Sequence, residues 1–228
     1  MKSCRLALVA AALALACPNA PAQGRETPYI TVDAGAAWVQ SMEIQQLNSP
    51  FFPRSSEIEF DPGFRLDAGF GYLLREGAVV GYKRAKAVFD IAVELDAGFI
   101  YNEAKSIGGS DLDGTGTTLD LYQIPLMANA IFSFPITERL RVSTGGGVGG
   151  VVMLMHADSL ASSASTEEEL VFGYQALANV SYGFTDNFSA GLSYRFLGTS
   201  NAEFGGDLQF SGDSVMTHFL GLSFTWVF

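Results

Sequence analysis

Long stretches of this chain alternate strictly between large apolar residues and small or polar ones. In residues 88–101, apolar side chains such as Ile91 and Leu95 alternate with acids such as Asp90 and Glu94. A period of two is the pattern of a β-strand whose two faces meet different surroundings. The alternation predicts eight strands, over residues 29–40, 63–74, 88–101, 119–134, 139–154, 170–184, 187–197 and 215–228.

The length of these strands favours a membrane barrel over a soluble sandwich or barrel. The predicted strands run to ten or more residues, whereas strands of globular proteins average about five or six. A tilted membrane-spanning strand needs about 9–11 residues. The polar face is rich in Gly, Ser and Asp, which suits a narrow interior better than a solvated exterior. The predicted fold is therefore all-β, an eight-stranded antiparallel transmembrane up-and-down β-barrel.

Aromatic residues on the apolar face support the same interpretation. They lie toward the strand ends, where the two membrane interfaces favour amphipathic rings. These residues are Tyr72, Tyr101, Tyr122, Tyr182, Phe184, Tyr194, Trp226 and Phe228.

The N-terminal segment resembles an export signal rather than part of the fold. Lys2 and Arg5 precede an apolar run, Leu6 to Ala16, which is too short to span a bilayer as a helix. The small residues of Ala20-Pro21-Ala22 then suit a signal peptidase. We expect a signal peptide over residues 1–22 and a barrel domain over residues 23–228. Two alternatives stay open: the run anchors the chain, or Cys17 carries a lipid within an imperfect lipoprotein motif.

Cleavage after Ala22 changes the composition. It removes both cysteines, Cys4 and Cys17, so a disulfide or a cysteine ligand is not expected in the mature chain. Without Lys2 and Arg5, the 13 basic residues become 11 against 24 acids, a net charge near −13. A nucleic-acid partner requires a basic surface, so this class of partner is excluded.

Neither of two short motifs predicts a cofactor or a metal. The glycines of residues 145–150 lie within a predicted strand and lack the lysine of a phosphate-binding loop. We interpret them as room for long inward side chains from neighbouring strands. Asp111-Leu112-Asp113-Gly114 resembles the start of a calcium loop, but the terminal Glu of that motif is missing. We expect no cofactor and no defined metal site.

The connections differ in length and charge. A barrel with an even number of strands has both termini in the periplasm, short turns there and long loops outside. The four connections that follow odd-numbered strands hold 14 acids and only two bases, Arg54 and Lys105. We expect these loops at the cell surface, beside lipopolysaccharide. The long loops are residues 41–62, 102–118, 155–169 and 198–214, and the turns are residues 75–87, 133–138 and 185–186.

Three segments carry a family resemblance. Residues 180–198 (VSYGFTDNFSAGLSYRFLG), the turn 134–140 (FPITERL) and the apolar stripe of the last strand are similar to those of small outer-membrane barrels. The similarity is to the OmpA transmembrane domain and to opacity-type porin-like proteins, and covers about residues 28–228. It implies insertion by the barrel assembly machinery, which would recognise a C-terminal signal consisting of Leu220, Leu222, Phe224, Trp226 and Phe228.

The inward face of the predicted barrel carries an unusual number of charges. An eight-stranded barrel is just wide enough for side chains to fill its interior. Buried charges must pair or become neutral, so we predict an ionic plug, with a narrow ion or proton path as the alternative. The predicted inward polar set is Asp33, Arg65, Asp67, Asp90, Glu94, Asp96, Gln123, Asn129, Arg139, Arg141, Gln175, Asn179 and Arg195.

These features support three functional hypotheses. The first is a structural or surface-interaction (adhesin-like) protein in contact with outer-membrane lipid and lipopolysaccharide, whose extracellular ligand the sequence does not identify. The second is a narrow porin or an OmpW-like transporter of small or hydrophobic solutes. The third is a lipid-A-modifying enzyme, because some small barrels use a His near the outer rim, here His156 or His218. A Ser/His/acid set must converge in space, which spacing along the chain cannot show. We interpret each His as a rim or interface residue and expect no enzymatic activity.

Overall fold

Eight long antiparallel strands form a closed ring. The computed structural model describes residues 27–46, 55–80, 87–113, 115–159, 162–205, 209–212 and 214–228. Each ring strand pairs with its neighbour in the chain, and β1 pairs with both β4 and β13, which closes the barrel. The ring strands are β1 (Thr27–Val39), β4 (Gly63–Val80), β5 (Ala87–Ile107), β7 (Thr117–Pro135), β8 (Leu140–Ser159), β9 (Ser162–Gly183), β10 (Phe188–Thr199) and β13 (Met216–Val227).

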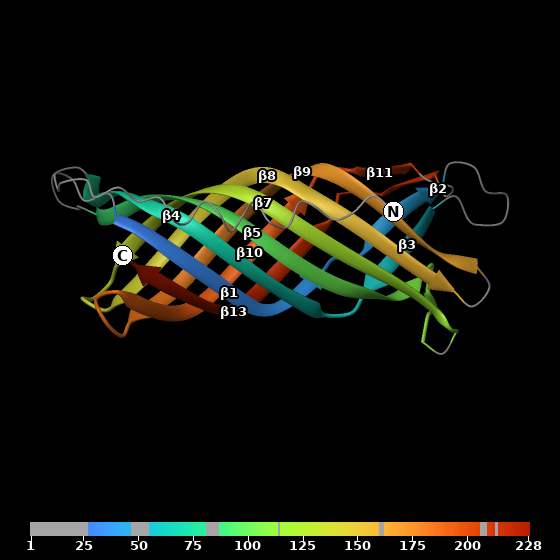
Figure 1. Cartoon of the computed structure of the whole chain (residues 1–228), viewed down its shortest axis with the longest axis horizontal. Helices are drawn as coiled ribbons and strands as arrows, with labels where there is room; N and C mark the ends of the chain where they lie inside the picture. Colours follow the sequence, from blue (N-terminus) through green and yellow to red (C-terminus); the bar gives the residue numbers. More distant parts are fainter. Residues whose placement is uncertain are drawn as a thin grey trace.

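The two ends of the barrel differ. One end carries the C-terminus and the tight turns of residues 136–139 and 184–187, and we call it the turn end. The opposite end, here the loop end, carries β2 (Met42–Gln46), β3 (Ser55–Phe60), β11 (Ala202–Gly205) and β12 (Gln209–Gly212) (Figure 1). There β3 pairs with β5 and continues the barrel wall into a sheet in the order β5-β3-β2-β12-β11, while β6 (Ser110–Asp111) pairs with β5.

The outside of the ring is apolar, as the alternation predicts. Leu95 and Leu126 are 66% and 52% exposed, although both are large hydrophobic residues. Aromatic side chains contact one another at both ends of this apolar surface. Tyr101 and Tyr122 lie toward the loop end with ring centroids 5.2 Å apart, and Phe188 and Trp226 lie at the turn end, 5.1 Å apart. An apolar band between two aromatic belts is the surface that a bilayer requires.

Several strands extend farther than predicted. β5, β8 and β9 contain 21, 20 and 22 residues. Much of the predicted loop 155–169 belongs to β8 and β9, and the loops 41–62 and 198–214 contain β2, β3, β11 and β12. The turn 75–87 is also partly strand, since β4 and β5 pair up to Val80 and Ala87. The pattern of inward apolar residues continues past the aromatic belt, and their burial stabilises the longer ladder.

Buried apolar side chains fill the loop-end half of the barrel. Four of them are methionines, whose flexible side chains fill irregular space well. The charged residues that the sequence places inside lie nearer to the turn end, so the interior has an apolar zone and a polar zone. The apolar zone, here the loop-end core, consists of Ala37, Val39, Met42, Ile58, Ile100, Ala104, Leu119, Leu121, Met127, Val151, Met153, Met155, Val171, Leu197 and Val215.

The N-terminal prediction cannot be compared with the fold. Residues 1–22, the predicted signal peptide, lie outside the described residues. Within the described part of the chain, no helix is long and apolar enough to cross a membrane.

An arginine on the outer surface tests the lipid-facing assignment. Leu222 is 53% exposed and lies on β13 midway between His218 near the loop end and Trp226 near the turn end. An arginine at the bilayer midplane costs a barrel about 2–4 kcal/mol. We expect Leu222→Arg to lower the free energy of unfolding in lipid vesicles by that amount. Leu222→Met is the matched control, and equal stability of the two variants would contradict a lipid-facing Leu222.

Candidate functional site in the barrel interior

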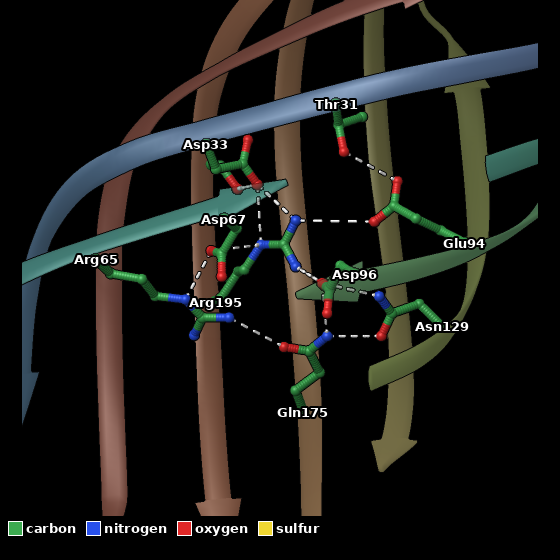
Figure 2. A network of polar contacts seen from close by, with 10 residues as sticks. Thr31, Asp33, Arg65, Asp67, Glu94, Asp96, Asn129, Gln175 and Arg195 are labelled. Carbon is green, nitrogen blue, oxygen red and sulfur yellow. Dashed lines mark hydrogen bonds and ion pairs between the residues drawn. The ribbon is translucent and has the colours of Figure 1, made fainter. Parts of the chain in front are cut away.

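The polar zone of the interior is built around a group of charged side chains from four strands, β1, β4, β5 and β10. Their carboxylates and guanidinium groups are 95% or more buried. Successive inward positions of one strand lie two residues apart, which is why β4 supplies both Arg65 and Asp67 and β5 both Glu94 and Asp96. Figure 2 shows the arrangement. We define the interior ionic cluster as Asp33, Arg65, Asp67, Glu94, Asp96, Asn129, Gln175 and Arg195, with the two amides coming from β7 and β9.

Arg195 lies at the centre of the cluster, among four carboxylates (Figure 2). Its Nη2 and Nε donate to Asp33 Oδ2 over 2.5 and 3.0 Å, and its Nη1 donates to Asp96 Oδ2. Asp67 Oδ2 and Glu94 Oε1 lie farther away, each 3.8 Å from a guanidinium nitrogen. A planar guanidinium with five donors suits this role, because it contacts several carboxylates at once.

Arg65 forms a second ion pair within the cluster. Its Nε donates to Asp67 Oδ2 over 2.7 Å, and its Nη2 donates to Gln175 Oε1 over 3.4 Å. The guanidinium carbon lies 5.5 Å from the centre of the Phe219 ring. This cation–π contact lies where the cluster meets the apolar part of the interior.

Two amides add hydrogen bonds to the Asp96 oxygen that Arg195 contacts. Asn129 Nδ2 and Gln175 Nε2 donate to Asp96 Oδ2 over 3.0 and 3.1 Å, and Gln175 Nε2 also donates to Asn129 Oδ1 over 2.6 Å. A buried charge with several donors is far less costly than an unpaired one.

Glycines leave the space that the inward side chains occupy. A Cβ atom on Gly147 would lie 1.9 Å from Asn129 Oδ1, and one on Gly98 would lie 2.1 Å from Asp67 Oδ1. No real Cβ atom tolerates such a distance. The interpretation of the glycine run as room for neighbouring side chains is therefore confirmed at Gly147.

Five of the predicted inward residues lie outside the cluster. Gln123 is buried and donates to Thr217 Oγ1 over 3.0 Å. Arg141 Nη2 lies 3.5 Å from Asp90 Oδ2, but the Arg141 side chain is 52% exposed. Asn179 is half-buried near these two residues. Arg139 is exposed in the turn before β8 and does not join the interior network, because the strand pattern ends at the turn.

Two groups of buried side chains thus follow one another along the interior. The ionic cluster occupies the middle of the barrel, and the loop-end core follows it. Between the cluster and the turn end lies a cavity of about 140 Å³, whose lining includes Asp33, Glu94 and Arg195. We call it the turn-end cavity.

A family model for the "Outer membrane protein beta-barrel domain" matches residues 7–228. The chain belongs to this outer-membrane β-barrel family. The family resemblance and the fold class predicted from the sequence are both confirmed. No curated protein sequence matches the chain.

Comparison with solved structures finds similar small outer-membrane barrels. AlkL, studied in DMPC bilayers, is 15% identical with a TM-score of 0.51, over 93% of this chain and 95% of AlkL. Neisserial surface protein A is 19% identical with a TM-score of 0.48, over 88% and 97% of the two chains. Ail of Yersinia pestis, in complex with the heparin analogue sucrose octasulfate, is 13% identical with a TM-score of 0.44, over 89% and 100%.

Two histidines of this family barrel lie near its loop end. His218 Nδ1 lies 2.8 Å from Tyr194 Oη, and its Nε2 lies 2.9 Å from Gln40 Nε2. His156 Nδ1 lies 2.9 Å from Thr166 Oγ1, and Asp120 lies opposite His156 on β7. In the described part of the chain, neither imidazole forms an ion pair or a hydrogen bond with a carboxylate.

Sequence reasoning missed several interior residues of this family barrel. Thr31 Oγ1 donates to Glu94 Oε2 over 3.3 Å, and Tyr29 also hydrogen-bonds Glu94. Ser193 Oγ lies 3.5 Å from Asp33 Oδ2. Thr31 and Ser193 stood on the polar side of the alternation, which is the signal that could have identified them. Tyr29 shares the parity of Thr31 and Asp33, but an aromatic residue at the start of the strand did not stand out as part of a polar face. A separate feature is the segment that resembles the start of a calcium loop. There the backbone N–H of Asp113 donates a hydrogen bond to Asp111 Oδ1, as in a turn.

Proposed function

We propose that this chain is a structural or surface-interaction (adhesin-like) protein of the outer membrane, with a plugged barrel and a loop end that faces the cell exterior. The observation that supports the proposal is that buried side chains of the ionic cluster and of the loop-end core occupy the interior at two successive levels, and we infer that they close it. A closed barrel leaves its outer surface as the part that meets other molecules. The turn end, where β1 begins and β13 ends, would then lie in the periplasm.

Acidic side chains at the loop end favour an interaction role. Glu43 and Glu57 lie directly opposite each other on β2 and β3, and both are exposed. Glu103 and Asp120 form a second opposed pair on β5 and β7. Like charges at directly opposite positions destabilise a sheet, so a structural role alone does not favour them. A basic surface, or lipopolysaccharide phosphates bridged by divalent cations, would complement these pairs.

Neutral variants at the loop end test this role. Glu43→Gln/Glu57→Gln is expected to change the binding of expressing cells to host-cell monolayers or matrix-coated surfaces, without changing the amount of folded barrel. Glu138→Gln removes an exposed acid at the opposite end and is the matched control. If both variants and the wild type bind equally, and deletion of the whole chain also has no effect, the surface-interaction role is wrong.

The last strand is expected to carry the assembly signal. Trp226 lies on the outward face of β13 near its end and is 42% exposed, and Phe228, which directly follows the strand, is 68% exposed. We expect Trp226→Ala/Phe228→Ala to lower the amount of heat-modifiable, folded barrel in outer-membrane fractions. Leu192→Ala removes an exposed apolar residue from β10 and is the control. Wild-type levels of the double variant would contradict recognition of the stripe by the assembly machinery.

One observation favours a transporter of hydrophobic solutes as a second candidate. The loop-end core is apolar and rich in methionine, and such side chains rearrange around ligands of different shapes. Uptake of a hydrophobic solute that is lost on deletion of the chain would favour this candidate. Unchanged uptake after deletion of the chain would contradict this candidate and leave the surface-interaction role as the proposed function.

We infer that the chain is not an enzyme. His156 and His218 contact hydroxyl and amide groups, and their environments hold no base oriented by an acid. Overexpression is expected to leave the lipid A profile unaltered. A new lipid A species in the wild type, absent from His156→Ala or His218→Ala, would contradict this inference.

A further inference from the structure

The interior ionic cluster contains more negative than positive charge. Its four carboxylates, on Asp33, Asp67, Glu94 and Asp96, face two guanidinium groups, on Arg65 and Arg195. All six residues are at most 5% exposed. Uncompensated charges in a low-dielectric interior cost several kcal/mol each, even after relaxation. Another positively charged species must therefore compensate the cluster.

Glu94 is the carboxylate with the weakest compensation. Asp33 and Asp67 each accept from a guanidinium nitrogen within 2.7 Å, and Asp96 is closer still to Arg195. The nearest guanidinium nitrogen to Glu94 is Arg195 Nη2, 3.8 Å from Oε1. Within the described part of the chain, each of the four acids has one buried oxygen that accepts no hydrogen bond, but only Glu94 Oε1 and Asp33 Oδ1 belong to residues that line the turn-end cavity.

Both of these carboxylates line the turn-end cavity. Ten residues of its lining carry a hydroxyl, and Tyr29, Thr31 and Ser193 stand beside the carboxylates. The cavity extends from Arg195 past Asp90 and Arg141, and that pair is neutral. The net negative charge thus lies at the closed end of the cavity, among oxygen atoms.

We propose that Glu94 and Asp33 bind a monovalent alkali cation such as Na⁺ at the closed end of the turn-end cavity, with hydroxyls of Tyr29, Thr31 and Ser193 as neighbouring oxygen donors. Hard cations prefer oxygen ligands, and carboxylate and hydroxyl oxygens supply them here. Arg195 stands close by and opposes a doubly charged ion more strongly than a singly charged one. Within the described residues, no three Asp, Glu, His or Cys side chains meet in a metal-binding arrangement, which also favours the monovalent ion.

Ion-dependent stability tests the site. The full chain is folded in detergent micelles at neutral pH and heated in NaCl or in choline chloride of equal concentration. The measured quantity is the midpoint temperature, at which half of the band of folded protein is lost from a gel. We expect a higher, saturable midpoint in Na⁺, since choline is too large for the site. We also expect the folded chain to broaden the ²³Na NMR line, and we expect LiCl to reverse this broadening by competing for the site. Equal midpoints together with unchanged ²³Na lines would overturn the proposal.

Two variants locate the effect. Glu94→Gln keeps the shape of the side chain but removes its charge, and is expected to abolish the Na⁺ response. Glu103→Gln removes an exposed carboxylate outside the barrel and should retain the full response. If Glu94→Gln does not fold, LiCl reversal of ²³Na broadening on the wild type still decides whether a site exists. A Glu94→Gln barrel with an undiminished Na⁺ response would contradict the proposal and place the compensating charge elsewhere. A wild-type barrel whose stability responds to pH but not to Na⁺ would also contradict it, and would assign the compensation to bound protons.

Discussion

Arg195→Met is expected to destabilise the barrel by about 3–5 kcal/mol, because removing one partner of a buried ion pair leaves its carboxylates without compensation. Arg195 is 4% exposed and contacts Asp33 and Asp96 directly. Methionine fills similar space but supplies no positive charge. The free energy of unfolding in urea, measured in lipid vesicles by tryptophan fluorescence, reports the loss.

Arg141→Met is the matched control for this prediction. Arg141 also faces an acid in the interior, Asp90, but its side chain is 52% exposed and the pair is 3.5 Å apart. Ion pairs of that kind contribute about 0–1 kcal/mol. If Arg195→Met lost no more stability than Arg141→Met, the cluster would not be the electrostatic centre of the interior.

Met153→Lys is expected to have an effect of at least similar size, by a different cause. Met153 is fully buried in the loop-end core, whose residues carry no carboxylate, and Glu169, opposite it on β9, already has an interaction of its own. Losses above about 4 kcal/mol are typical of an unpaired charge placed in such a core. We expect little or no folded barrel in outer-membrane fractions.

Met153→Leu distinguishes charge from shape. A swap between these residues changes volume little and usually costs less than about 1.5 kcal/mol. A Met153→Lys barrel that folds as well as Met153→Leu would mean that water reaches the loop-end core. The second level of closure would then be wrong.

The alternation of the sequence predicted much of the interior, because a strand has only two faces. It placed Arg65 with Asp67, and Glu94 with Asp96, on one face of their strands. It also placed Leu121 and Met153 on that inward parity, although their role as an apolar core was not recognised. The same pattern predicted the ring of strands and its lipid-facing exterior, which the structure and the family match confirm.

Other features depend on information that no local pattern contains. Arg195 meets Asp33 from 162 positions away along the chain, and only the closed ring brings them together. Arg139 follows the parity of β8 but precedes the strand, and alternation alone does not define where a strand begins. The predicted loop 155–169 is mainly strand because its backbone pairs in register, for example Met155 with Glu167, and burial of the core favours that pairing.

A planar-bilayer recording of the purified, folded chain tests the double closure most directly. With the ionic cluster and the loop-end core both in place, the barrel is expected to show no steady unitary conductance in KCl at moderate voltage. An eight-stranded barrel filled by side chains leaves no continuous water path. Steady, reproducible unitary steps from the wild-type barrel would contradict a plugged interior and favour a narrow pore.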